Sequence, residues 1–329
     1  MNRTLLSIAQ TAELIKSGKI LSLAGDEKLL AQLPKGTWIG GSIPYFVAED
    51  GGRQTSELIF VTDLNEAAGN PVTVQAYDLG TIKNIAKEAP ENGFTIVIVP
   101  ALSGMHAEYA NHARDFEEMF MKPIIGWVSG VNLADLGKVT PKVFNGVTGE
   151  CFDNAAVALH VTLPENKMAT INILNLFKQG EGDVITFPEL GFSATTCLVN
   201  GVETNFADYV TEKKLDLARP LVADYSGAQI NTSFQAVDAE GKKVAFYAPV
   251  FPGIEYRQAA PVGDYVSEFD ALASGRHQAT QFSCNCILNY LYGKLEGRKT
   301  GDLTGPITFG EIAFQLLNQT LVYLEVKEI

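Results

Sequence analysis

The sequence predicts an α+β fold of two halves, each with a largely antiparallel or mixed β-sheet flanked by helices. The chain has 329 residues, which exceeds the usual size of one domain. Apolar residues make up 46% of it and charged residues 19%, as is typical of a globular protein with a packed core. Strand patterns outnumber helical ones and do not alternate regularly with them, which favours α+β over α/β.

The first part of the chain mixes short helices and strands. Helical spacing at residues 11–18 stops at Gly18, and Asp26 is placed to cap a second helix that ends before Pro34. An unbroken apolar run at 94–100 predicts a strand covered on both faces, and Ser103 can cap the helix after it. The predicted helices here are 11–18, 27–33, 82–88 and 105–120, and the predicted strands are 20–24, 37–47, 58–64, 72–78 and 94–100.

From residue 124 to residue 189 the pattern is nearly all strand. Turn-like segments at 164–166 and 180–182 indicate an antiparallel meander. We place a boundary near residue 198, between an N-terminal domain of residues 1–198 and a C-terminal domain of residues 199–329. Strands 230–237 and 243–248, joined by Asp238-Ala239-Glu240-Gly241, are predicted to form a hairpin. The other predicted strands are 123–128, 142–147, 155–163, 168–177, 183–187, 278–283, 307–312 and 320–326. The predicted helices lie around Tyr209, at 266–273 and at 287–295.

Charge and composition limit the partners. The formal net charge of −13 argues against nucleic acid and anionic membranes, which both bind basic surfaces. No apolar run approaches the length of a membrane span, and the start of the sequence does not have the apolar core of a secretory signal. Four cysteines in so long a chain do not resemble a disulfide framework. We therefore expect a cytoplasmic protein that binds neither nucleic acid nor membrane.

A series of short motifs runs through the chain in a fixed order. They are Ile39-Gly40-Gly41-Ser42, Val199-Asn200-Gly201, Phe282-Ser283-Cys284, Phe309-Gly310-Glu311 and Asn318-Gln319-Thr320. In order and spacing, this series resembles the FIST domain, a sensory module of bacterial signalling proteins. The resemblance implies a non-enzymatic sensory protein that binds amino acids or similar small metabolites and signals through a partner protein.

Two groups near the C-terminus carry the ligand-binding hypothesis. Ser283, Cys284 and Asn285 stand where a strand is predicted to give way to a helix, whose first N–H groups favour a ligand carboxylate. Glu311, next to Gly310, needs hydrogen-bond partners or a cationic group such as an ammonium if it is half-buried. The structural alternatives are a small buried cysteine with a capping Ser283 or Asn285. Glu311 would then accept backbone N–H bonds at a corner.

Four further residues are candidates for the wall of the same pocket. Gly40, Gly41 and Ser42 follow a strand, but the chain continues extended, so the helix that a phosphate-binding loop requires is missing. Close backbone packing, or a backbone wall of the pocket, suits these glycines better. Asn318 either orients a ligand or closes a turn with its side-chain amide, and we favour the turn.

Enzymatic and cofactor alternatives remain. Cys284 would be the nucleophile of a thiol-dependent hydrolase, with His277 as the assignable histidine, and Ser103 that of a serine hydrolase. We expect neither, and we expect no metal site, because the cysteines and histidines have no recognisable zinc spacing. We also expect no cofactor. Haem is retained as an alternative because some proteins of the resembling family bind it, with His160 or His112 as the axial ligand.

Overall fold

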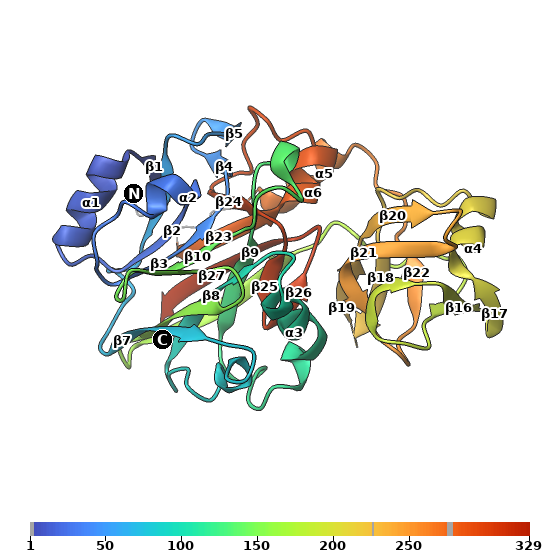
Figure 1. Cartoon of the computed structure of the whole chain (residues 1–329), viewed down its shortest axis with the longest axis horizontal. Helices are drawn as coiled ribbons and strands as arrows, with labels where there is room; N and C mark the ends of the chain where they lie inside the picture. Colours follow the sequence, from blue (N-terminus) through green and yellow to red (C-terminus); the bar gives the residue numbers. More distant parts are fainter. Residues whose placement is uncertain (1–2, 226, 275–278) are drawn as a thin grey trace.

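The computed structural model describes residues 3–225, 227–274 and 279–329. It confirms the α+β class, with 43% of residues in strands and 16% in helices, so strands supply most of the frame. The elements form two lobes (Figure 1). We call residues 3–174 together with 265–329 the main lobe, and residues 185–258 the small lobe.

Three six-stranded mixed sheets build the main lobe. Each contains a parallel pair, β2 with β3, β8 with β9, and β23 with β24. The first sheet has the order β1 (Arg3–Leu6), β6 (Ile59–Asp63), β2 (Leu21–Gly25), β3 (Trp38–Ser42), β10 (Val143–Asn145), β11 (Glu150–Phe152). The second has the order β26 (Gln315–Leu317), β25 (Glu311–Ala313), β9 (Ile124–Ser129), β8 (Gly93–Pro100), β12 (Ala156–Thr162), β7 (Val72–Tyr77). The third has the order β13 (Lys167–Leu174), β27 (Leu321–Glu328), β23 (Thr280–Cys286), β24 (Gly305–Thr308), β4 (Tyr45–Ala48), β5 (Gly51–Gln54).

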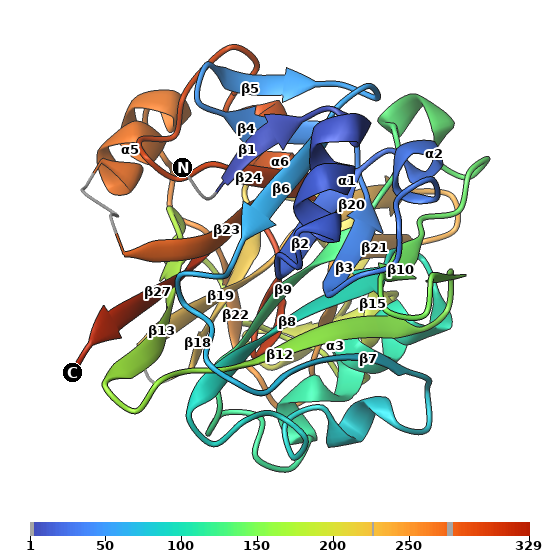
Figure 2. The same ribbon diagram turned by 90° about the vertical axis from the view of Figure 1, so that its left-hand side faces the viewer.

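Helices pack on these sheets, and the largest core cluster joins all three sheets to one another. Ile15 of the first helix packs in one cluster with Trp38, and Figure 2 shows α1 and α2 in front of the first sheet. Met105 packs with Val97 of the second sheet, and Phe269 packs against the third. The helices of the main lobe are α1 (Ile8–Lys16), α2 (Glu27–Leu30), α3 (Gly104–His112), α5 (Tyr265–Ala273) and α6 (Ile287–Tyr292), with 3-10 turns η1 (Ile82–Asn84), η2 (Ala113–Asp115) and η3 (Leu133–Asp135).

The small lobe has its own aromatic core, in which Phe206 and Phe246 both pack against Phe187. Its strands pair antiparallel in two sheets, β17-β16-β14-β22-β18-β19 and β15-β21-β20. Its elements are β14 (Ile185–Thr186), β15 (Gly191–Ala194), β16 (Thr196–Val199), β17 (Val202–Asn205), α4 (Phe206–Glu212), β18 (Leu221–Tyr225), β19 (Ala228–Thr232), β20 (Phe234–Asp238), β21 (Lys243–Val250) and β22 (Tyr256–Gln258). The chain returns to the main lobe after it, so the small lobe is an insertion between two main-lobe segments.

Several local expectations are confirmed, and others are wrong. The apolar run at 94–100 forms β8, which is buried throughout, and the hairpin of β20 and β21 is present. The meander is wrong, because β12 pairs with β7 and β8 and β13 pairs with the final strand β27. The helix expected at 82–88 is not an α-helix: residues 82–84 form the 3-10 turn η1, and turns follow it. The boundary near residue 198 falls inside β16, and where the chain divides into folding units stays a prediction.

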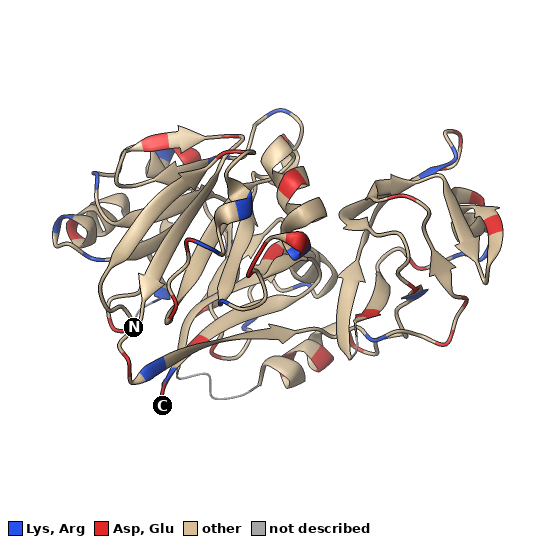
Figure 3. Ribbon diagram, turned by 90° about the horizontal axis from the view of Figure 1, so that it is seen from below, with Lys and Arg blue, Asp and Glu red and all other residues tan. Residues whose placement is uncertain are grey.

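Charged residues lie mainly in helices and loops, and most of the strand ribbon visible in Figure 3 belongs to uncharged residues. None of the helices in the described residues is long and apolar enough to cross a membrane.

The parallel pairing of β8 and β9 depends on Gly126. A Cβ atom there would lie 1.8 Å from the carbonyl oxygen of Val97. We predict that Gly126→Ala lowers the free energy of unfolding by at least about 2 kcal/mol, because the strands must separate. Urea denaturation checks this, with Gly182→Ala as the control, since a Cβ there meets nothing within 4 Å. Equal stability of the two variants would contradict the prediction.

Candidate functional site

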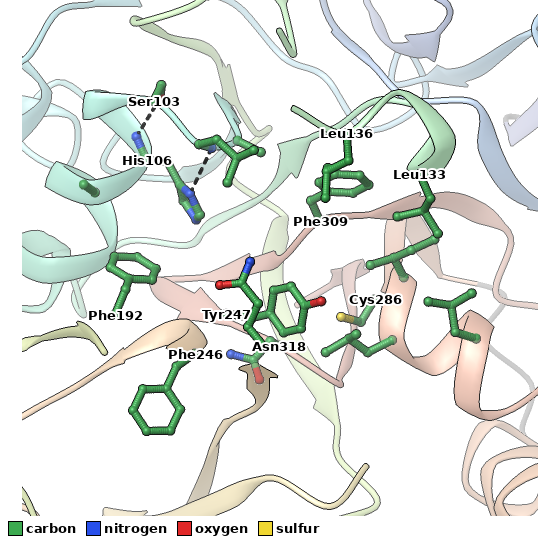
Figure 4. Close-up of a pocket in the computed structure, with 17 residues that line it drawn as sticks. Ser103, His106, Leu133, Leu136, Phe192, Phe246, Tyr247, Cys286, Phe309 and Asn318 are labelled. Carbon is green, nitrogen blue, oxygen red and sulfur yellow. Dashed lines mark hydrogen bonds between the residues drawn. The ribbon is translucent and has the colours of Figure 1, made fainter. Parts of the chain in front are cut away.

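A cavity of about 310 Å³ lies between the two lobes (Figure 4). This volume is at the lower end of the range of small-molecule sites. The main lobe contributes α3, the segment around η3, α6 and Phe309. The small lobe contributes side chains of β15, β20 and β21. The lining residues are Ala101, Leu102, Ser103, His106, Ala107, Leu133, Leu136, Phe192, Gln235, Phe246, Tyr247, Cys286, Ile287, Leu288, Leu291, Phe309 and Asn318.

The lining is apolar, and none of these residues is Asp, Glu, Lys or Arg. The polar residues of the lining are therefore few: Ser103, His106, Gln235, Tyr247, Cys286 and Asn318. The Tyr247 ring points toward the side of the cavity where Cys286 lies (Figure 4). Burial is the main cause that raises the pKa of the Tyr247 hydroxyl, so this group stays protonated at neutral pH.

His106 lies on the wall formed by α3. The helix begins because the Ser103 hydroxyl accepts a hydrogen bond from the His106 backbone N–H at 3.0 Å. The Leu102 N–H donates to Nδ1 of the His106 ring at 3.4 Å (Figure 4). The backbone of Leu102 is left-handed, with φ of 59°, a conformation that is strained for leucine. The structure thus holds Leu102 in an uncommon geometry next to the imidazole.

Burial fixes the charge of His106, and a hydrogen bond to Nδ1 fixes its tautomer. The side chain is 9% exposed, and desolvation lowers its pKa to about 4, so the ring is neutral at pH 7. Because Nδ1 accepts a hydrogen bond, the single ring proton lies on Nε2. This Nε2 atom is buried and has no hydrogen-bond partner among the described residues. The His106 ring also packs against the Phe192 ring of the small lobe in an edge-type arrangement, at 5.5 Å between centroids.

Asn318 lies between β26 and β27 and is 2% exposed. Its Oδ1 accepts a hydrogen bond from the Ser233 backbone N–H at 3.0 Å, which fixes the orientation of the amide. Its Nδ2 is buried without a partner in the part of the chain that the structure describes. The turn function that we favoured is not the observed role, because the amide binds the small lobe, 85 residues away in sequence.

Glu311 lies behind the cavity wall, in β25, and is fully buried. Its carboxyl oxygens accept hydrogen bonds from Thr308 Oγ1 at 3.2 Å and from Thr320 Oγ1 at 2.9 Å. Desolvation is the main cause that raises its pKa to about 8, and hydrogen bonds from Thr320, Cys286 and Thr308 partly offset it. Most of the carboxyl is therefore protonated at pH 7. Gly310 beside it accepts a backbone hydrogen bond from Val128.

The structure brings Glu311 close to the 283–285 segment, through Thr308, whose hydroxyl also contacts the Asn285 carbonyl oxygen at 3.3 Å. The predicted change from strand to helix at residues 283–285 is wrong in its position. Strand β23 continues to Cys286, which is the N-cap of α6, and neither Ser283 nor Asn285 caps the helix.

All three residues of this segment are buried in β23 and lie outside the cavity lining. Ser283 donates to the Thr304 carbonyl at 2.7 Å, and the Cys284 thiol donates to the Gly126 carbonyl at 3.4 Å. Asn285 Oδ1 accepts from Asn289 at 2.8 Å. These contacts are internal to the main lobe.

Gly40, Gly41 and Ser42 lie in β3, outside the cavity lining. A Cβ at Gly41 would lie 2.6 Å from the Trp127 ring, so close packing explains this glycine. The Ser42 hydroxyl donates to the Gly130 carbonyl at 2.8 Å, and Ser42 lines a separate, more polar surface hollow. The structure does not bring this segment together with Glu311 at one cavity.

The catalytic and haem alternatives gain no support from these positions. Burial raises the pKa of the Cys284 thiol well above its usual value, which disfavours a reactive thiolate. The Ser103 hydroxyl donates to the Pro100 carbonyl and caps α3. His277 lies outside the described residues.

Both ring nitrogens of His160 lie within hydrogen-bond distance of a hydroxyl, of Tyr77 at 2.9 Å and of Thr95 at 2.8 Å. Haem ligation by His160 would therefore break an existing hydrogen bond. His112 lies on the surface of α3, 4.0 Å from Glu108.

Sequence reasoning missed His106 as a cavity residue. One signal was present: His106 shares a helix face with Tyr109 and Ala110, at three- and four-residue spacing, and this face is buried. The small-lobe lining residues Phe192 and Tyr247 had no comparable signal, because their approach to α3 depends on how the lobes pack.

Comparison with protein families matches residues 6–327 to DUF6976, described as a family of unknown function. No curated protein and no solved structure matches the chain. The family match covers nearly the whole sequence but assigns no activity. The resemblance to the FIST domain stays a prediction.

Glu311 should make the stability of the protein depend on pH. The unfolded state loses this proton near pH 4.5 and the folded state near pH 8, so ionisation opposes folding as pH rises between these values. We predict that the stability contribution of Glu311 falls by roughly 4–5 kcal/mol across this window. Urea denaturation at pH 5 and pH 8 should show a smaller loss of stability in Glu311→Gln than in wild type.

The matched control is Glu203→Gln, which changes an exposed glutamate of the small lobe. It should reproduce the wild-type pH dependence. If Glu311→Gln also reproduces it, the buried carboxyl does not retain its proton and the assignment is wrong.

Proposed function

The chain belongs to DUF6976, a family of unknown function, and we propose that it is a non-enzymatic protein that binds one small ligand in the cavity between its lobes. The observation that carries the proposal is the cavity itself, whose lining is apolar and includes His106 and Asn318, each with a buried nitrogen that has no hydrogen-bond partner among the described residues. Sites for small molecules are typically concave and apolar, with a few placed polar groups.

The position of the cavity supports a sensory role. Both lobes contribute to its wall, and a ligand that contacts both would favour one relative arrangement of the lobes over others. The resemblance to the FIST domain supports the same function. A partner protein that recognises the favoured arrangement would receive the signal, and a cytoplasmic setting fits this proposal.

Amino acids fit this cavity less well than uncharged molecules do. A zwitterion requires a cationic and an anionic partner, and the lining supplies neither. Glu311 and the segment 283–285 lie outside the lining, and the Glu311 carboxyl accepts hydrogen bonds from Thr308 and Thr320.

An uncharged fluorescent probe, N-phenyl-1-naphthylamine, tests the proposal directly. We predict saturable binding of one probe to wild type, with increased fluorescence. Ala107 lines the cavity, so Ala107→Trp should fill part of it and weaken binding by at least about tenfold. The control Ala239→Trp changes an exposed residue at the tip of the β20–β21 hairpin and should bind as wild type does.

Circular dichroism of all three proteins verifies that they are folded. Absence of saturable binding to wild type would refute the proposed function. Equal binding by wild type and Ala107→Trp would place the probe outside the cavity and contradict the proposal as well.

A further inference from the structure

We propose that the cavity recognises an uncharged, mainly apolar molecule through a carbonyl-type oxygen, which accepts a hydrogen bond from His106 Nε2–H, from Asn318 Nδ2–H, or from both. This inference rests on the proposed ligand-binding function and specifies the class of ligand. Ketones, lactones, esters and amides have the required oxygen.

The first argument is that both of the buried unpaired atoms on lining residues, His106 Nε2 and Asn318 Nδ2, are donors. Nδ1 of His106 accepts from Leu102, which leaves the proton on Nε2. Oδ1 of Asn318 accepts from Ser233, which leaves the amide hydrogens on Nδ2. Neither donor has a partner among the described residues, and both side chains are at least nine-tenths buried.

The second argument is energetic. A buried donor without a partner destabilises a protein by about 1–3 kcal/mol, so such groups are few in native structures. Two residues that carry such a donor, His106 and Asn318, line the same cavity here. A ligand oxygen that reaches either donor would satisfy it and recover this energy.

The third argument is backbone strain beside each donor. Leu102, which orients His106, has φ of 59°, and Gln319, which follows Asn318, has φ of 51°. Left-handed backbone at residues other than glycine is uncommon and clusters at functional sites. Here it occurs next to both donors.

The final argument concerns the charge of the ligand. A carboxylate would also accept from both donors, but no Lys or Arg belongs to the lining, and the net charge of −13 disfavours the approach of an anion. A buried anion without a cationic partner is strongly unfavourable. An uncharged oxygen avoids this penalty.

The experiment compares ligands that displace N-phenyl-1-naphthylamine from the wild-type protein. Valerophenone has a ketone where pentylbenzene has a methylene group, so the pair differs in the acceptor. 5-Phenylpentanoate and phenylalanine test the anionic and zwitterionic classes. We expect valerophenone to bind at least about fivefold more tightly than pentylbenzene, the effect of one net hydrogen bond. We expect it to bind more tightly than either charged compound.

Two variants locate the donor. His106→Phe keeps an aromatic ring and removes both nitrogens, and Asn318→Asp keeps the acceptor for Ser233 and replaces the amide. The ratio of pentylbenzene to valerophenone dissociation constants should fall toward one in at least one of them. This ratio is measured within one protein, so general loss of stability does not affect it.

Three outcomes would overturn the inference. Equal binding of valerophenone and pentylbenzene by wild type would show that the ketone oxygen accepts no hydrogen bond in the cavity. The proposed function would still stand, because ligands still bind. Tighter binding of a charged compound rejects the uncharged class. If the ratio of dissociation constants is unchanged in both variants, neither His106 nor Asn318 donates to the ketone oxygen. If the probe itself does not bind, the proposed function fails, and the inference fails with it.

Discussion

A buried network of hydrogen bonds between amide and hydroxyl groups holds the small lobe against the main lobe. The cavity exists because this network fixes the distance between the two lobes. Asn231 and Asn175 exchange side-chain hydrogen bonds at 3.0 Å, and Asn231 also donates to the Asn318 carbonyl at 3.1 Å. Gln319 Nε2 donates to the Ala218 carbonyl at 3.0 Å. Buried polar groups of this kind specify one geometry, because any displacement leaves some of them unpaired. The two lobes therefore meet in a defined arrangement.

Asn318 belongs both to this hydrogen-bond network and to the lining of the cavity. Its carbonyl oxygen and Oδ1 bind the small lobe, while its Nδ2 has no partner in the described chain. A ligand that accepts from Nδ2 would act on a residue that already holds the lobes together. This gives a physical route from occupancy of the cavity to the arrangement of the lobes. Cys286 extends the wall on the other side, where its buried thiol contacts Glu311.

Local sequence signals predicted several of the strands, helix caps and turns. The run at 94–100 became the buried strand β8, Asp26 and Ser103 cap α2 and α3, and the hairpin of β20 and β21 formed as expected. These features depend on neighbours in sequence, so periodicity and capping chemistry are sufficient to find them.

Features that depend on distant contacts escaped prediction. A meander was expected, but β13 pairs with the distant strand β27, which places Lys167 opposite Glu328. A local turn was expected at Asn318, but its side-chain amide accepts a hydrogen bond from Ser233 of the small lobe. His106 was not among the predicted site residues, because the burial of its helix face was not considered. The cavity depends on packing between lobes, which a single sequence does not encode in any local pattern.

A crystal structure of the full chain with valerophenone would decide whether the cavity recognises a carbonyl oxygen. We expect density for the ketone between the lobes, with its oxygen about 3 Å from His106 Nε2 or Asn318 Nδ2. Density at another site, or a ketone whose oxygen faces away from both nitrogens, would contradict the recognition that we infer.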